Sequence, residues 1–110
     1  MERPVKGDVV VVQFPFSDIP ESKRRPALVS ATTTDDNLIL CQITGQQRPD
    51  PDTIPITITD FHRGRLSRDS YLRPTRLFTI HSSKVFYTVR SIRQEKMQTI
   101  QKKFCEIFTR

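Results

Sequence analysis

Apolar residues occur along the chain in short runs, and polar segments that contain proline separate these runs. Residues 9–14 are rich in valine and do not alternate with polar residues, which predicts a strand covered on both faces. The dipeptide Gly7-Asp8 before them predicts a turn. The runs 27–29 and 38–44 predict two further short strands. We expect the intervening polar segments to be loops or turns.

The segment 15–26 is such a polar loop, with three prolines and a pair of arginines near its end. Later in the chain, Ile54, Ile56 and Ile58 alternate with polar residues, as in a half-buried strand. Pro55 places that strand at a sheet edge or at a strand start, because proline has no backbone N–H to donate.

The last part of the chain predicts two strands and a helix. Residues 60–70 predict a basic loop, and the apolar runs 77–80 and 85–89 predict a hairpin. Ser91 is a good N-cap for a following helix. The apolar residues of that helix share a helical spacing and predict one buried stripe: Met97, Ile100, Phe104, Ile107 and Phe108. We expect the three lysines of the same segment to lie outside the stripe.

Several short strands at regular spacing, followed by one helix, predict a mainly β (α+β) fold. The expected architecture is a small, strongly curved sheet or barrel of short, mostly antiparallel strands with a C-terminal helix. The length of 110 residues predicts a single domain, 1–110. Composition and periodicity alone do not predict a function.

The charge is unevenly distributed along the chain. Residues 1–62 contain 6 basic and 9 acidic side chains, a net of −3, and residues 63–110 contain 12 and 3, a net of +9, which together give +6. Twelve of the 18 basic residues are arginines, which suit bidentate contacts with phosphate. A basic half points to nucleic acid, an acidic protein or a membrane surface, and equally to a solvated face without a partner.

The two cysteines, Cys41 and Cys105, are far apart and lie among apolar residues, so we expect two small buried hydrophobes rather than a disulfide or zinc site. No metal-ligand spacing occurs, and we expect no metal and no cofactor. No apolar run approaches the ~20 residues of a membrane span, and no apolar signal segment follows residues 1–4. The expectation is a cytoplasmic protein without membrane contact.

Three segments carry a resemblance to the MazF/PemK family of bacterial toxins. Residues 7–30, GDVVVVQFPFSDIPESKRRPALVS, resemble the family's opening strand of the type GDVV-x-V-x-FPF and the loop that ends in RPA-[LV]-V. Residues 39–46, ILCQITGQ, resemble its strand that ends in a Thr-containing turn, and residues 64–80, GRLSRDSYLRPTRLFTI, are similar to the segment before its last strands. The resemblance covers nearly the whole chain.

The resemblance implies an SH3-like barrel that forms a homodimer and acts as the toxin of a type II toxin–antitoxin pair. Toxins of this family are metal-independent endoribonucleases that cleave single-stranded mRNA at short sequences. The implied antitoxin blocks the RNA groove with an acidic, partly disordered tail. The +9 half of this chain has the charge that both RNA and such a tail would bind.

The resemblance maps the family's catalytic arginine and threonine onto Arg25 and Thr44. RNA supplies its own nucleophile, the 2′-OH, so the protein has to align it, stabilise charge on the phosphate and help the 5′-oxygen leave. A guanidinium stays protonated, which favours charge stabilisation and proton donation over a general-base role for Arg25. The Thr44 hydroxyl can bind a phosphate oxygen or orient the 2′-OH. Without the resemblance, both residues would be ordinary surface or turn residues.

The other candidates for RNA contacts are mostly arginines of the basic half, and some of them could be only solvated. They are Arg24, Gln46, Arg63, Arg65, Arg68, Arg73 and Arg76. We predict Phe14 and Phe16 to be core and loop anchors rather than base-stacking platforms. His62 and His81 have no recognisable partner and are predicted to be structural. Gly45 stands where the family often has Ser or Thr, which removes one phosphate donor.

Two other functions remain open at this point. The related CcdB toxins have the same fold and inhibit DNA gyrase by binding it, since a fold does not dictate a function. A degenerate barrel that only binds RNA or an antitoxin is the third possibility. The segments RRPALV and LCQIT favour the nuclease.

Overall fold

The computed structural model describes residues 3–16, 23–63 and 69–110, with residues 62 and 63 described by their backbone alone. The described residues form seven strands, two short 3-10 helices and one α-helix. In chain order these elements are β1 (Asp8–Gln13), β2 (Arg24–Thr32), β3 (Asn37–Thr44), β4 (Ile54–Ile56), η1 (Ile58–Asp60), β5 (Phe61–Arg63), β6 (Ser70–His81), η2 (Ser82–Lys84), β7 (Tyr87–Ile92) and α1 (Gln94–Thr109).

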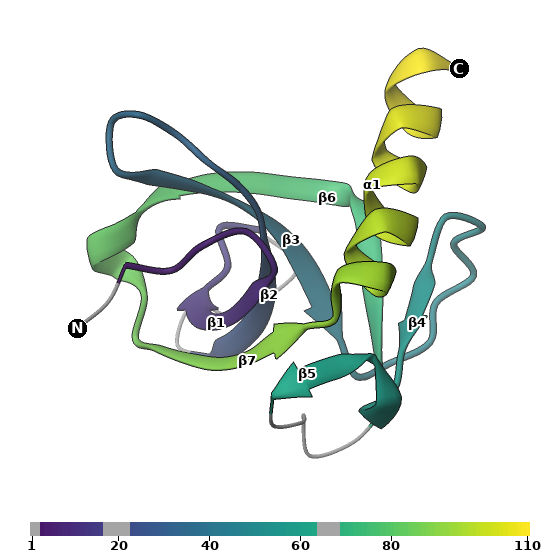
Figure 1. Cartoon of the computed structure of the whole chain (residues 1–110), viewed down its shortest axis with the longest axis horizontal. Coiled ribbons are helices and arrows are strands. Elements are labelled where there is room, and N and C mark those ends of the chain that lie inside the picture. Colours follow the sequence, from purple (N-terminus) through teal and green to yellow (C-terminus); the bar gives the residue numbers. More distant parts are fainter. Residues whose placement is uncertain (1–2, 17–22, 64–68) are drawn as a thin grey trace.

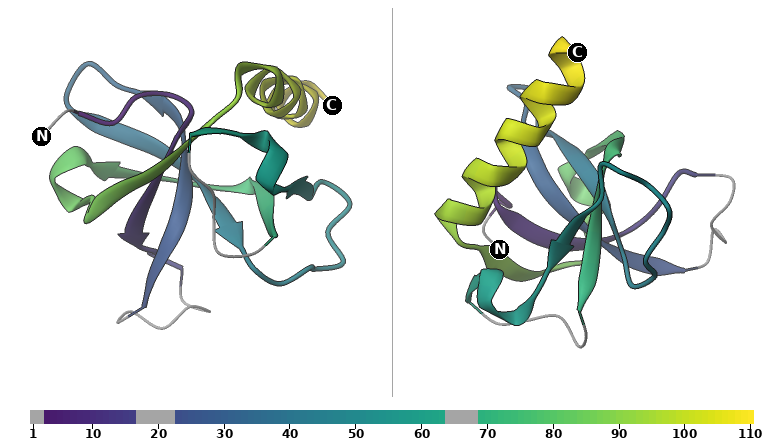
Figure 2. Two further views of the ribbon diagram at one scale, coloured as in Figure 1. Left: turned by 60° about the horizontal axis from the view of Figure 1, so that its bottom comes forward. Right: turned by 90° about the vertical axis from the view of Figure 1, so that its right-hand side faces the viewer.

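The strands form one strongly curled sheet in the order β4-β6-β3-β2-β1-β7-β5 (Figure 1). Every neighbouring pair in this order is antiparallel. The α1 helix packs beside β6, and its C-terminal half extends beyond the sheet (Figure 2). The predicted fold class, a small barrel-like sheet of antiparallel strands with a C-terminal helix, is therefore confirmed.

Two buried apolar clusters lie on opposite faces of the sheet, because successive side chains of a strand point to opposite faces. The helix-side core consists of Val9, Leu28, Cys41, Ile43, Ile54, Ile56, Phe61, Leu72, Ile92, Met97 and Ile100. The aromatic core consists of Val10, Val12, Phe14, Ala27, Val29, Leu38, Leu40 and Phe78. The valines of β1 contribute to both cores, which confirms that residues 9–14 form a strand covered on both faces.

The β2 strand begins earlier than predicted, at Arg24 instead of Ala27. Its first residues pair with the end of β1, down to Gln13 opposite Arg24. The pairing of β2 with β3 starts at Ala27. The residue before it, Pro26, has no backbone hydrogen to donate. Arg24 and Arg25 thus belong to a strand and not to a loop, because β1 is long enough to pair with both of them.

The predicted hairpin over residues 77–89 is wrong. The β6 strand pairs with β3 and β4, whereas β7 pairs with β1 and β5. The η2 turn between them carries the chain across the curled sheet (Figure 1). Two apolar runs joined by a short polar link have the same pattern in a hairpin and in a crossover of this kind, so local sequence does not separate the two.

The segment before β6 also differs from the prediction. Residues 61–63 of the predicted basic loop form β5, and residues 64–68 lie outside the described part of the chain. The expected edge strand with Pro55 is confirmed as β4, but it ends at Ile56. Ile58 is 54% exposed in η1, because the capping box of Thr57 and Asp60 turns the chain away from the sheet.

The α1 helix begins at Gln94, with Arg93 as its N-cap and without a side-chain cap. Ser91, the predicted N-cap, lies in β7, where its hydroxyl donates a hydrogen bond of 3.0 Å to Asp8 Oδ1. Of the predicted stripe, Met97 and Ile100 are buried, but Phe108 is 70% exposed where α1 extends beyond the sheet. Cys105 on this part of α1 is likewise exposed, contrary to expectation.

Within the described ranges, no helix is long and apolar enough to cross a membrane.

The two ends of the helix stripe give a direct test of this packing. Replacing Ile100, which is fully buried, with alanine should lower the free energy of unfolding by about 2–5 kcal/mol. The matched change Phe108→Ala should shift it by less than about 0.5 kcal/mol, because that side chain is mostly exposed. Urea denaturation of both variants measures this difference. Equal losses would show that α1 buries Phe108 as well.

Candidate active site

Arg25 and Thr44 lie two residues beyond the last paired residues of β2 and β3, which are Ala27 and Gln42. Ala27 pairs with Gln42, and Val29 pairs with Leu40, in an unshifted register. Extending this register by two residues places Arg25 opposite Thr44. Directly opposite residues of an antiparallel pair point to the same face, so both side chains lie on the face of the aromatic core, at its rim.

Neighbouring strands continue this row in both directions. Val12 of β1 pairs with Arg25, and Tyr71 of β6 pairs with Thr44. Val12 is part of the aromatic core. Each of the two polar residues is therefore held by a neighbouring strand, Arg25 by β1 and Thr44 by β6.

Thr44 ends β3 and is only 6% exposed. The backbone N–H of Gln46 donates to Thr44 Oγ1 at 3.2 Å, which closes a tight turn around Gly45. This hydrogen bond uses one lone pair of the hydroxyl oxygen, and the hydroxyl hydrogen can still be donated. Thr44 is thus arranged to donate to an acceptor such as a phosphate oxygen.

Arg25 is half-buried at the start of β2, and its Nε is buried without a hydrogen-bond partner. Within the described ranges, Arg25 also forms no ion pair with an acidic residue. Its guanidinium has two further nitrogens that can donate in parallel to two oxygens of one anion. A phosphate would satisfy this geometry.

Two more polar residues lie beside this pair. Gln42, only 4% exposed, is opposite Arg73 of β6, so their side chains share one face. Arg73 is 17% exposed, and its Nε lies 3.5 Å from Asp50 Oδ2. Arg73, a predicted RNA contact, is therefore placed next to the site but is already paired with an acidic residue.

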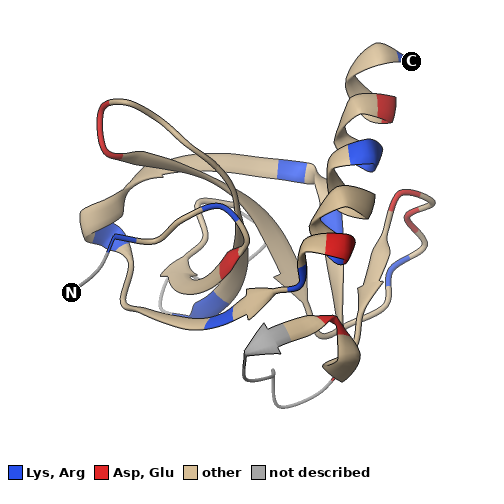
Figure 3. Cartoon of the chain, viewed as in Figure 1, with Lys and Arg blue, Asp and Glu red and all other residues tan. Residues whose placement is uncertain are grey.

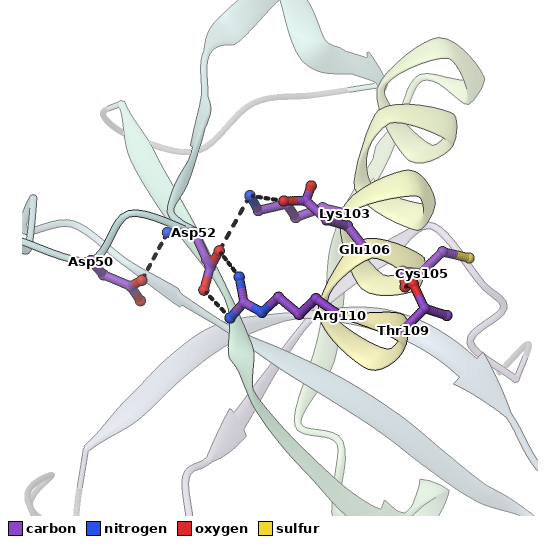
Figure 4. Close-up of polar contacts among 7 residues, drawn as sticks. All are labelled: Asp50, Asp52, Lys103, Cys105, Glu106, Thr109 and Arg110. Atoms are coloured by element: carbon purple, nitrogen blue, oxygen red, sulfur yellow. Dashed lines mark hydrogen bonds and ion pairs between the residues drawn. The ribbon is translucent and has the colours of Figure 1, made fainter.

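The loop after Thr44 is fastened to α1 through Asp52 (Figure 4). Arg110 donates from both terminal nitrogens to Asp52 at 3.1 and 3.0 Å, and Lys103 Nζ lies 3.2 Å from the same carboxylate. The backbone N–H of Asp52 donates to Asp50 Oδ1 at 2.9 Å, which links this contact to the Asp50–Arg73 pair. Asp50 and Asp52 thereby hold the β3–β4 loop against β6 and α1, respectively.

These contacts have an electrostatic consequence. The hydrogen bonds from Arg110, and then from Lys103, hold the pKa of the Asp52 carboxyl below its ordinary value, although burial opposes this shift. The same carboxylate raises the pKa of Arg110. The loop that follows Thr44 is thus fixed by charge as well as by backbone.

A family model described as PemK-like, MazF-like toxin of type II toxin-antitoxin system matches residues 5–108. The chain belongs to this family. The match includes the strands that bring Arg25 and Thr44 together, so the resemblance inferred from short motifs is confirmed across nearly the whole chain.

Solved structures of similar shape agree with this assignment. An endoribonuclease in complex with its cognate antitoxin from Mycobacterial species is 12% identical, with 96% of this chain and 94% of that chain covered and a TM-score of 0.74. The Mycobacterium tuberculosis toxin MazF-mt6 is 15% identical (92% and 95% covered, TM-score 0.69), and MazF of the MazE-MazF complex from Deinococcus radiodurans is 15% identical (99% and 98%, TM-score 0.73). At these identities the likeness shows a shared fold. No curated protein sequence matches the chain.

The remaining predicted contacts of this PemK/MazF-family chain do not gather at one place. Arg24 stacks over the Phe86 ring at 3.8 Å, and Arg76 stacks over Phe16 at 4.0 Å. The Gln46 side chain is exposed next to Thr44. Arg63 has a described backbone in β5, but its side chain, Arg65 and Arg68 lie outside the described residues.

The structure describes three of the four aromatic and histidine side chains for which a role was predicted. Phe14 is buried, and its ring centroid lies 5.2 Å from that of Phe78 in an edge-on arrangement, while the half-buried Phe16 lies 5.4 Å from Phe78. Both are anchors of the aromatic core, as predicted. His81 accepts a hydrogen bond from the Ser83 N–H and caps η2, which is a structural role, and the His62 side chain is not described.

The charge asymmetry of the chain is partly cancelled in the fold. Lys and Arg mark α1, β6 and β7, whereas Asp marks the β2–β3 turn and the β3–β4 loop (Figure 3). Basic residues of the second half pair with acidic residues of the first, as in the Lys96–Asp60 pair at 3.4 Å and the Lys103–Asp52 pair. Two of the lysines predicted to lie outside the helix stripe are therefore bound to carboxylates.

No group of three or more His, Cys, Asp or Glu residues in the described ranges is arranged to hold a metal ion. Cys41 is buried, as predicted, and its thiol donates to the Arg73 carbonyl at 3.1 Å. Burial raises the pKa of the Cys41 thiol, which keeps it protonated and unreactive at neutral pH.

Sequence reasoning missed two groups of residues. One is Gln42, the polar residue in an otherwise apolar run at a position that alternates with Leu38 and Leu40 toward the core. A polar residue at such an interior position is the signal that could have identified it. The other is the Asp52 contact with α1, for which the sequence contains no comparable signal.

The pKa of Asp52 predicts how stability changes with pH. A carboxyl whose pKa is lowered by folding stabilises the fold above its unfolded pKa of about 3.9, and this contribution is lost as the pH falls through the folded pKa. Asp52→Asn should therefore be less stable than the parent at pH 7, and the two should converge below about pH 4. Urea denaturation between pH 7 and pH 2.5 measures this convergence.

Arg110→Gln is the matched control, because it removes the first cause of the pKa shift and leaves the carboxyl in place. In that background, Asp52→Asn should change the pH dependence less. A stability difference between the parent and Asp52→Asn that stays constant down to pH 2.5 would contradict this account.

Proposed function

We propose that the chain is the toxin of a type II toxin–antitoxin pair and an endoribonuclease that cleaves single-stranded mRNA at short sequences without a metal ion. The observation that supports this most strongly is the register of β1, β2, β3 and β6, whose extension by two residues aligns Arg25 with Thr44 on the face of the aromatic core. Family membership supports it independently, and the similar solved structures include proteins named endoribonucleases.

In the proposed reaction the 2′-hydroxyl of the RNA gives up its proton to water as its oxygen attacks the adjacent phosphorus. The bond from phosphorus to the 5′-oxygen breaks, and that oxygen takes up a proton from water. The products are a 2′,3′-cyclic phosphate and a 5′-hydroxyl. Arg25 donates to the non-bridging oxygens, where negative charge grows in the transition state. Thr44 donates its hydroxyl hydrogen to the same phosphate, which agrees with the use of its oxygen by the Gln46 N–H.

The proposed partners follow from charge and from the relatives. Single-stranded RNA and an acidic antitoxin both suit a chain with a net charge of +6. Two of the similar structures are complexes with an antitoxin, described as a cognate antitoxin in one and as MazE in the other. We propose the same class of partner here, together with a homodimer acting in the cytoplasm, where mRNA is translated. The residues that the sequence predicted to contact RNA remain proposed contacts: Arg24, Gln46, Arg63, Arg65, Arg68, Arg73 and Arg76.

Cleavage of a long single-stranded RNA in EDTA tests the proposed activity and its site. The parent protein should give discrete fragments with 5′-hydroxyl ends and should leave a matched DNA strand intact, since DNA has no 2′-OH. Arg25→Gln and Thr44→Val should each lower kcat by about 10²–10³-fold, because each removes a preorganised donor.

Arg3→Gln is the matched control for charge. Arg3 pairs with Asp36 at 2.6 Å near the β2–β3 turn, at the other end of β2 from Arg25. This variant loses the same charge and should cleave within about twofold of the parent. A folded parent protein that binds RNA without cutting it would support the non-enzymatic alternatives, and an Arg25→Gln variant with parental activity would show that the site is wrong.

A further inference from the structure

Gln42 is a buried polar residue with an unsatisfied side-chain oxygen. It lies in the middle of the β3 run, is 4% exposed, and its Oε1 has no hydrogen-bond partner. Leaving a buried polar atom without a partner costs about 1–3 kcal/mol, whereas an apolar residue of the same shape would avoid that cost. Packing alone therefore does not account for a glutamine at this position.

A complementary donor lies on the next strand. The Arg25 Nε is buried and also has no hydrogen-bond partner. Gln42 pairs with Ala27, two residues from Arg25, so Arg25 and Gln42 are diagonal neighbours on one face. Diagonal positions are about 7–8 Å apart, a distance that two long side chains can span.

A second donor lies directly opposite Gln42 on β6. The Arg73 Nε forms an ion pair of 3.5 Å with the Asp50 carboxylate but, like the Arg25 Nε, makes no hydrogen bond. Asp50 is in turn fixed by its contact with the backbone of Asp52. The two arginines differ in their charged partners: Arg73 is drawn to Asp50, whereas Arg25 has no acidic partner among the described residues, so Arg25 is the donor that is free to turn toward both Gln42 and an incoming phosphate.

We propose that Gln42 is a positioning residue, which accepts a hydrogen bond from the Arg25 Nε when RNA is bound. This inference rests on the proposed nuclease function and adds to it a residue that determines the direction of the arginine. With its Nε held from behind by Gln42, the guanidinium presents its two terminal nitrogens to the phosphate. Gln42 does not itself touch the reacting atoms.

Gln42→Met tests this proposal, because methionine is also unbranched and of similar length but has no acceptor oxygen. We expect kcat to fall by roughly 10–100-fold, since a misplacement of about 1 Å at a reacting group can cost about 10² in rate. Affinity for an RNA with 2′-deoxyribose at the cleaved nucleotide should stay within about twofold. The melting temperature should be unchanged or higher, because the unpaired buried oxygen is gone.

A lower kcat without a lower melting temperature distinguishes a positioning role of Gln42 from a purely structural one. A residue that matters only for packing would lower the melting temperature and the activity together. Gln98→Met on the exposed surface of α1 is the matched control and should change neither. Gln42→Asn keeps a buried carboxamide but withdraws its oxygen by one methylene, so it should also lose kcat while it remains folded.

A double-mutant cycle shows whether Gln42 acts through Arg25. In an Arg25→Lys background, which has no Nε–H in this position, Gln42→Met should change the residual rate by less than about twofold. Additive losses, or a Gln42→Met variant as active as a cleaving parent protein, would overturn the proposal and leave the nuclease function intact. Failure of both Gln42 variants to fold would likewise overturn it. Absence of cleavage by the parent protein would overturn both.

Discussion

The antiparallel pairing of β2 with β1 and β3 is the constraint on which the candidate site depends. Arg25 and Thr44 are 19 positions apart in the chain, and the register between β2 and β3, extended by two residues, is what aligns them on one face. A shift of one residue in either pair would turn one of the two side chains to the other face of the sheet. The two buried cores oppose such a shift, because it would move the apolar side chains of three central strands from one core to the other and disrupt the packing of both.

Ion pairs fix the β3–β4 loop, which follows Thr44, in addition to the sheet register. Acidic residues of the first half hold the β3–β4 loop in place by pairing with arginine and lysine from β6 and α1. Because they form these ion pairs, Arg73, Lys103 and Arg110 are less available to bind RNA. Lys23, just before β2, and Arg24 and Arg25 at its start are among the described basic residues that form no ion pair, so no carboxylate competes with a phosphate for them.

Much of the fold could be predicted from local patterns, and the errors share one cause. The valine run of β1, the alternating edge strand and the amphipathic helix are encoded in a few neighbouring residues, so their prediction succeeded. The start of β2 and the partners of β6 and β7 depend on contacts between distant segments, which periodicity does not report. The same limit applied to the site. Motif resemblance identified Arg25 and Thr44, whereas Gln42 and Asp52 matter only because of what the fold places beside them.

The most direct test of this account is a structure of the protein with a single-stranded RNA that carries 2′-deoxyribose at the cleaved nucleotide. This RNA can bind but has no nucleophile at that position. We expect the phosphate after this nucleotide to lie within hydrogen-bond distance, about 3 Å, of both the Arg25 guanidinium and the Thr44 hydroxyl. An RNA that binds elsewhere on the protein and places no phosphate near Arg25 would contradict the account.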